Sequence, residues 1–145
     1  MRKLEYPCQL IPDEERGFSV SFPDVPEALT YGGDRHEALE MAEDALSVAL
    51  TFYLENGEPV PVPGSRRAGQ VSVSPNLQIA LKIALADALR ESRKRPADLA
   101  RLIGTDFKSV KRLLDPNHSS RIPALEKALA CLGKRVAITT EDKVA

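Results

Sequence analysis

The sequence predicts an α+β chain made of two small modules, and three observations indicate this. Short runs in which apolar residues alternate with polar ones, as in strands, occur before residue 75 and surround one long helical segment. After Pro75 the periodicity is helical. Residues 1–74 hold six Lys and Arg against thirteen Asp and Glu, a net of −7, whereas residues 75–145 hold fourteen against eight, a net of +6. We therefore expect two modules with different partners, residues 1–74 and residues 75–145.

The composition suits soluble globular modules. The chain has 145 residues, of which 43% are apolar and 28% charged. No apolar run approaches the roughly 20 residues that a membrane helix needs, and the N-terminus lacks a secretory signal. Cys8 and Cys131 are the only cysteines, which argues against a disulfide framework or a cysteine-rich metal site. A cytoplasmic location without a membrane partner is expected.

Four short strands are expected in the first module. Residues 4–12 form the first, which Pro7 should restrict to an edge or a bulged position. Residues 18–22 alternate with period two and put Phe18, Val20 and Phe22 on one face. Residues 28–31 and 71–74 supply the third and the last strand. Together they predict a small antiparallel sheet with one helix on one face.

That helix is expected over residues 34–56. Asp34 is a suitable N-cap, and Glu37 stands three residues later, as in a capping box. A polar stripe, typical of a solvated face, runs from His36 to Glu55 and includes Ser47; residues such as Met41 and Phe52 fill the apolar remainder. Asn56 and Gly57 end the helix, and a loop rich in Pro and Gly follows.

The first helix of the second module, residues 76–92, is apolar on most of its surface. Only Gln78, Lys82 and Asp87 interrupt the apolar residues before Arg90. A helix of this kind must be covered on more than one side. Its own module is small, so the pattern favours a subunit interface and a homo-oligomer.

Residues 95–115 have the pattern of a helix-turn-helix. Pro96 suits the first turn of a short helix, although Arg95 before it predicts a weak cap. Gly104 supplies a tight turn, and Asp106 can cap a second helix whose core side includes Val110 and Leu113. Two short helices joined at a steep angle by a turn with Gly are what the motif requires. Residues 123–133 predict a closing helix.

A helix-turn-helix of this kind would place its second helix in the DNA major groove. Lys and Arg can read guanine edges, Ser can contact a base or phosphate, and Phe can touch a thymine methyl group. Basic residues around the motif, Arg101 and Arg121 among them, can hold the phosphate backbone. The alternative without DNA binding is a helical hairpin with a solvated basic face. The candidate DNA-binding residues are Arg101, Phe107, Lys108, Ser109, Lys111, Arg112 and Arg121.

Catalytic chemistry is not indicated by the sequence. The two histidines, His36 and His118, belong to no metal-ligand pattern, and the phosphate-loop and dinucleotide motifs are missing. The acids of the helix over residues 34–56 have the spacing of a solvated face. We therefore expect no catalytic residue, no metal and no cofactor, and a protein that is not an enzyme.

The first half resembles the HicB family of antitoxins. The residues that carry the resemblance are Tyr6-Pro7, residues 17–20, Phe22 to Pro26, Thr30 to Gly32, residues 37–39 and 45–46 of the helix, and the Pro-Val repeat over residues 59–63. The second half resembles Cro/repressor-type helix-turn-helix domains, which some HicB-like proteins carry at this position. The resemblance implies a partial ribonuclease H-like fold that has lost its catalysis.

The resemblance also implies a function. Such a protein would neutralise a small basic HicA-like toxin that cleaves messenger RNA, and would repress its own operon as a homodimer or tetramer bound to operator DNA. Toxin contact is expected near Phe22, Pro23, Asp24 and Tyr31. Two alternatives remain. A stand-alone transcriptional regulator would sense a small molecule in its N-terminal domain, and an active nuclease would need several carboxylates on the strands, which supply only Glu5.

Overall fold

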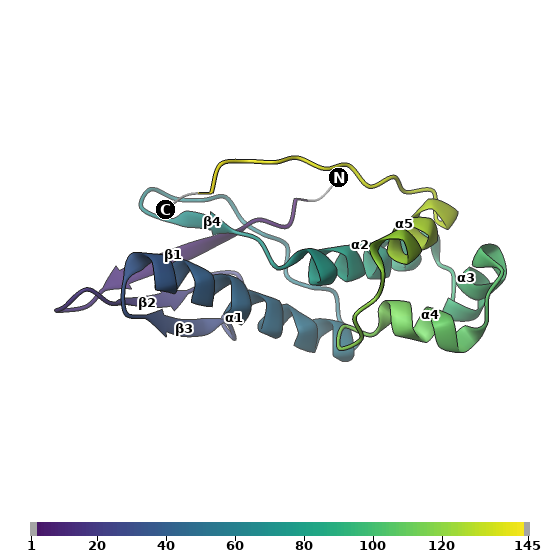
Figure 1. The fold of residues 1–145 in the computed structure, drawn as a ribbon, viewed down its shortest axis with the longest axis horizontal. Helices are drawn as coiled ribbons and strands as arrows, with labels where there is room; N and C mark the ends of the chain where they lie inside the picture. Colours follow the sequence, from purple (N-terminus) through teal and green to yellow (C-terminus); the bar gives the residue numbers. More distant parts are fainter. Residues whose placement is uncertain (1–2, 144–145) are drawn as a thin grey trace. The chain divides into compact units, whose positions relative to one another are not determined.

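A computed structural model describes residues 3–143 of the chain (Figure 1). The chain folds into two compact units. The first unit extends to Tyr53 and includes Val60–Asn76, and the second comprises Leu54–Pro59 and Leu77–Lys143. The first contains a small antiparallel sheet and most of one helix, and the second is helical. The predicted α+β class, with a small antiparallel sheet and additional helices, is confirmed.

The sheet has four strands in the order β3-β2-β1-β4. They are β1 (Tyr6–Pro12), β2 (Phe18–Ser21), β3 (Leu29–Gly32) and β4 (Val71–Val73). Every pairing is antiparallel. β1 pairs with β2 through residues 9–12 and with β4 through residues 6–8, so its two neighbours are staggered along it. β3 and β4 are the edges of the sheet.

The expectation that Pro7 makes β1 an edge or bulged strand is wrong as to the edge, because β1 lies between β2 and β4. The stagger explains how a proline is tolerated in an inner strand. Pro7 lies opposite Ser72 of β4, but the pairing with β2 starts only at Gln9. At Pro7 the strand therefore has a neighbour on one side, and the missing N–H removes no bond to β2.

Helix α1 (Arg35–Glu55) lies across one face of the sheet (Figure 1). The predicted cap is present, because the Glu37 N–H donates to Asp34 Oδ1 at 2.8 Å. The Glu37 carboxylate reaches back to the Gly33 N–H at 3.1 Å, one residue before the position that a capping box uses. The core between helix and sheet contains fully or almost fully buried side chains, among them Cys8, Val20, Ala42, Leu46 and Leu50.

The surface of α1 differs from the sequence pattern in two respects. Ser47, expected on a solvated stripe, is buried, and its Oγ accepts the Asn76 N–H at 3.0 Å. Met41 and Phe52, expected in the apolar remainder, are instead exposed, by 38% and 54%. The apolar residues of α1 are therefore divided between the core and an open stripe on its surface.

The second unit packs four helices, which are α2 (Leu77–Ser92), α3 (Pro96–Ile103), α4 (Phe107–Leu114) and α5 (Ile122–Cys131). Its core combines side chains from all four: Leu81, Leu85, Ala88, Leu89, Leu99, Ala100, Val110, Leu113, Leu125, Ala128 and Leu129. Residues 134–143 continue from α5 without helix or strand.

Part of the apolar surface of α2 is covered by the core of its own unit. Leu81, Leu85 and Leu89 join the core of the second unit, and Ile79 and Ile83 are also buried, whereas Leu77 at the start of the helix is 63% exposed. The second unit therefore covers one side of α2, and the homo-oligomer stays a prediction.

Candidate functional site

Helices α3 and α4 are joined by a short turn whose geometry is fixed at both ends. Gly104 has φ 83° and ψ 35°, and its N–H donates to Ala100 O at 2.9 Å, which ends α3. A left-handed conformation of this kind favours glycine. Asp106 caps α4, because its Oδ1 accepts the Ser109 N–H at 2.7 Å. This hydrogen bond lowers the pKa of the Asp106 carboxyl group, so the cap is charged at neutral pH.

The outer face of α4 is basic and contains one aromatic side chain. Val110 and Leu113 are buried in the core, while Lys108, Lys111 and Arg112 are exposed on the other side of the helix. Phe107 is 49% exposed, and Lys111 Nζ lies 5.7 Å from the centre of its ring. Of the five residues predicted on this face, four lie together on it. The fifth, Ser109, is half-buried at its border.

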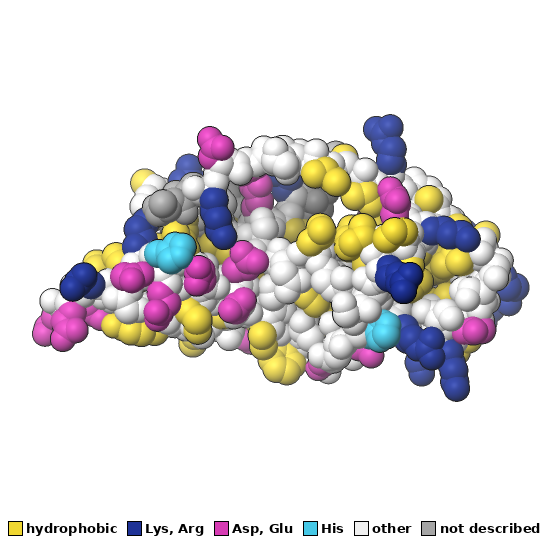
Figure 2. Space-filling view, in the orientation of Figure 1, with side chains coloured by type: hydrophobic (Ala, Val, Ile, Leu, Met, Phe, Trp, Pro, Cys, Tyr) yellow, Lys and Arg dark blue, Asp and Glu magenta, His cyan; other side chains and the backbone are white. Residues whose placement is uncertain are grey.

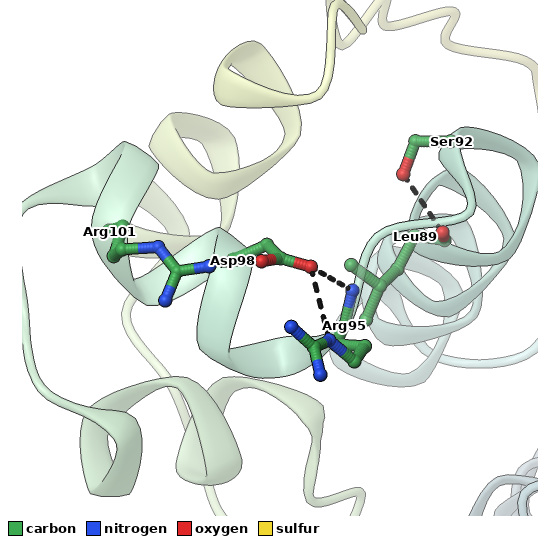
Figure 3. A network of polar contacts seen from close by, with 5 residues as sticks. All are labelled: Leu89, Ser92, Arg95, Asp98 and Arg101. Atoms are coloured by element: carbon green, nitrogen blue, oxygen red, sulfur yellow. Dashed lines mark hydrogen bonds and ion pairs between the residues drawn. The ribbon is translucent and has the colours of Figure 1, made fainter.

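The start of α3 has no capping bond from the Arg95 side chain, as the sequence predicted, but Asp98 holds the Arg95 backbone in place. Its Oδ2 accepts the Arg95 N–H at 2.8 Å, and the Arg95 side chain lies 3.6 Å from the same oxygen. Arg101, predicted to hold phosphate, forms an ion pair with the other oxygen (Figure 3). The hydrogen bond from Arg95 and the two cations lower the pKa of Asp98. Arg121, the other predicted phosphate contact, is exposed at the N-terminus of α5.

A buried lysine holds the other end of α4 in place. Lys82, in the middle of α2, is fully buried. Its ammonium group donates to the carbonyls of Arg112, Asp115 and His118 at 3.0, 2.6 and 2.6 Å, and to Ser120 Oγ at 3.0 Å. A cation at this position also suits the negative end of the α4 dipole. Burial lowers the pKa of Lys82, and the nearby Asp115 carboxylate opposes that shift.

Gln78, one turn before Lys82, extends this arrangement. Its amide nitrogen donates to Ser120 O at 3.0 Å, and its amide oxygen accepts the Ser120 N–H at 2.8 Å. Gln78 and Lys82 therefore fix both α4 and the loop over residues 115–120. The sequence showed them only as interruptions of an apolar surface. A single lysine within such a surface was the signal that could have indicated a buried polar contact.

One of the four residues predicted to contact a toxin does not lie at the surface. Phe22 is 2% exposed and packs in the core. Pro23 is exposed, and Asp24 holds the loop that follows α1 by accepting the Gly64 N–H at 2.8 Å. Tyr31 is 50% exposed on the sheet face opposite α1, where its hydroxyl donates to Asp13 Oδ2 at 2.5 Å. Phe22 is therefore unavailable for direct contact.

The remaining reactive groups have ordinary structural surroundings. Burial raises the pKa of the Cys8 thiol to about 11, so this thiol is protonated at neutral pH. His36 is exposed and lies 2.9 Å from Glu40. Among residues 3–143, no group of three His, Cys, Asp or Glu is placed to hold a metal ion. No helix in this range is long and apolar enough to span a membrane.

Comparison with known proteins gives consistent results over most of the chain. Residues 5–84 match a family described as the HicB-like antitoxin of bacterial toxin–antitoxin systems. Antitoxin HicB 1 of Photorhabdus laumondii is 40% identical over 141 residues, which cover 97% of this chain and 90% of that protein. Antitoxin HicB of Escherichia coli K12 is 37% identical over 135 residues, covering 93% and 98%. Antitoxin HicB of Pseudomonas fluorescens is 33% identical over 140 residues, covering 95% and 94%.

Proposed function

The chain belongs to the HicB-like antitoxin family of bacterial toxin–antitoxin systems, and we propose that it neutralises a small basic HicA-like toxin and represses its own operon. The toxin would cleave messenger RNA, and both activities would take place in the cytoplasm. The observation that supports this division of labour best is the charge, −7 over residues 1–74 and +6 over residues 75–145. An acidic surface attracts a basic protein, and a basic one attracts DNA.

In this proposal the first unit is a protein-binding domain without catalysis, related to the ribonuclease H fold. The chain would act as an inhibitor and not as an enzyme. An acidic domain bound to the toxin would cover part of the toxin surface. Its carboxylates would also repel the phosphates of messenger RNA and so keep the RNA away from the toxin.

Toxin neutralisation can be tested by co-expression with the small basic protein encoded next to this chain. We expect the full chain to restore growth that the basic protein arrests, and the two proteins to elute as one complex. Neutralisation would be ruled out by two results together. Growth would stay arrested in cells that produce at least as much of the intact chain as of the basic protein, and the two purified proteins would elute separately. The Lys108→Ala, Arg112→Ala variant is the matched control, since it changes only the second unit and should rescue equally well.

We further propose that α3 and α4 form a helix-turn-helix that places α4 in the major groove. The exposed side chains Phe107, Lys108, Lys111 and Arg112 support this role, because they lie together on the side of α4 away from the core. A dimer or tetramer would present two such helices to half-sites about 34 Å apart, so the operator would be an inverted repeat.

The expected effect of changing Arg112 to Ala is a loss of about 1–3 kcal/mol in operator affinity and a relaxed preference at one base pair. Arg121→Ala should weaken binding to every sequence alike and reduce the salt dependence, because a phosphate contact releases counterions. Arg101 is a less clear test, since its removal also breaks an ion pair with Asp98.

These variants can be compared by measuring affinity for operator and random DNA at two salt concentrations. Lys127→Ala is a suitable control, because Lys127 is exposed on α5 and was not assigned to the DNA-binding face. Unchanged operator affinity in the Lys108→Ala, Arg112→Ala double variant would show that α4 does not read the DNA.

A further inference from the structure

The exposed apolar residues of α1 lie on one line of the helix. Met41, Val48 and Phe52 are separated by seven and four residues, which places them on the same side. They are 38%, 57% and 54% exposed. From Met41 to Phe52 the helix rises about 16 Å, at roughly 1.5 Å per residue. This line of residues, called the α1 stripe below, is an apolar surface long enough to contribute to a protein interface.

Acidic residues border the α1 stripe on one side. Glu37 and Asp44 are exposed, and each is three or four residues away from a member of the stripe, which makes them neighbours on the helix surface. Figure 2 shows acidic side chains gathered over α1 with hydrophobic side chains beside them. Over residues 35–55 there are five acids, at positions 37, 40, 43, 44 and 55, against one Arg. The combination fits an apolar surface with basic residues at its rim.

A second exposed apolar surface lies on the open face of the sheet but has a different polar surrounding. Ile11, Leu29 and Tyr31 are 53%, 68% and 50% exposed. Ile11, Ser19 and Tyr31 lie opposite one another across β1, β2 and β3, and so do Gln9, Ser21 and Leu29. The polar residues within these rows are uncharged. Asp13, directly after β1, is hydrogen-bonded to Tyr31 and stays ionised, and the charge of Glu15 also acts on Tyr31. The negative charge on this face therefore lies at the end of the rows and not along them, as it does on α1.

We infer that the α1 stripe and its acidic border are the surface on which the first unit binds the basic toxin. This inference rests on the proposed function, and it moves the expected contact from residues 22–31 to α1. The charge of the α1 stripe's border indicates which kind of partner binds there. Nucleic acids and anionic lipids would be repelled by Glu37 and Asp44, and a second copy of α1 would bring the same acids toward them. A basic protein is attracted by them.

The test compares the two apolar surfaces of the first unit in the full chain. Val48→Ser, Phe52→Ser removes the centre of the α1 stripe, and Ile11→Ser, Leu29→Ser makes a matched change on the open sheet face. Affinity is measured for the small basic protein encoded next to this chain. We expect the α1 variant to bind about tenfold more weakly or worse, as for loss of interface anchors. The sheet variant should bind within about twofold of the unchanged chain.

The charged border is tested separately with Asp44→Lys, for which Glu14→Lys in the turn after β1 is the control. Asp44→Lys should slow association and reduce its salt dependence, because opposite charges steer the encounter. Circular dichroism verifies that each variant is folded.

The outcomes separate the inference from the proposed function. If the unchanged chain does not bind the basic protein, the proposed function fails. If it binds and the folded α1 variants bind equally well, only the α1 surface is wrong. Light scattering of the chain alone tests whether a second copy of the chain binds the α1 stripe instead. If the α1 variant changes its oligomeric state while its toxin binding stays intact, the stripe serves self-association and the inference is overturned.

Discussion

Replacing Lys82 by Met should destabilise the second unit by about 2–4 kcal/mol and abolish specific DNA binding under conditions where the first unit still binds the toxin. Met fills almost the same space but donates no hydrogen bond. The carbonyls of Arg112, Asp115 and His118 would each lose a donor. The Arg112 carbonyl keeps the Ser120 hydroxyl and the Asp115 carbonyl keeps the His118 N–H, so the His118 carbonyl is the acceptor most affected. Leaving one such acceptor unpaired costs about 1–3 kcal/mol, and removing the buried charge offsets part of the total.

The loss in DNA affinity has a geometric reason beyond stability. Arg112 and Asp115 lie at the C-terminal end of α4, so Lys82 fixes the position of that end against α2. Once these hydrogen bonds are lost, α4 can tilt. Its outer side chains are then no longer aligned with the base edges in the major groove. Operator affinity should therefore fall more than affinity for random DNA, which depends mainly on phosphate contacts.

Two further substitutions make the Lys82 prediction specific. Ser120→Ala removes one of the four acceptors and should cost only about 0.5–1.5 kcal/mol, and Lys127→Met, on the exposed side of α5, should stay within about 0.5 kcal/mol. For a unit of this size, about 3 kcal/mol corresponds to a fall in Tm of roughly 12–24 °C. If Lys82→Met melts with the unchanged chain and keeps its preference for the operator, Lys82 does not position α4.

The measurement can follow the two units separately. Tyr6, Tyr31 and Tyr53 are the only tyrosines, all of them belong to the first unit, and the chain has no Trp. Tyrosine fluorescence therefore reports the first unit, while hydrogen exchange of the amides in α2 to α5 reports the second. For Lys82→Met we expect faster exchange in α2 to α5 and an unchanged fluorescence transition.

Local sequence signals predicted the elements of the fold well. Asp34, Gly104 and Asp106 were expected at helix ends, and each makes the bond that its position requires. These signals work because a cap or a tight turn depends on the residue itself and on neighbours within four positions. The buried side of α4 at Val110 and Leu113 followed from helical periodicity for the same reason.

The features that the sequence missed depend on residues far apart in the chain. Lys82 binds partners that lie 30 to 38 positions away, and no local pattern shows that their carbonyls converge on it. Phe22 follows the alternating run of β2 and looks like a possible contact until the folded chain places it in the core. Likewise, Pro7 indicates an edge strand, but only the stagger of β2 and β4 shows how an inner strand accommodates it.

Two adjacent glycines between β3 and α1 are expected to respond to alanine in opposite ways. A Cβ atom added to Gly32 would lie 2.2 Å from Ala38 N and 2.4 Å from Ala38 Cα, inside the first turns of α1. These are backbone atoms of the helix that covers the sheet, so no side chain can move aside. Gly32→Ala should therefore push α1 away from β3 and destabilise the first unit by about 3 kcal/mol or more.

Gly33→Ala is the matched control, and it should be neutral or stabilising. A Cβ at Gly33 meets only Glu37 Oε1, at 3.9 Å, and its φ lies outside the range that disfavours side chains. Alanine there should add about 0.4–1 kcal/mol, because it restricts the unfolded chain. Tyrosine fluorescence measures both variants. Gly32→Ala should also lose growth rescue while the second unit still binds operator DNA, since α2 to α5 pack around their own core. Equal melting of the two variants would mean that α1 does not depend on its close approach to β3 at Gly32.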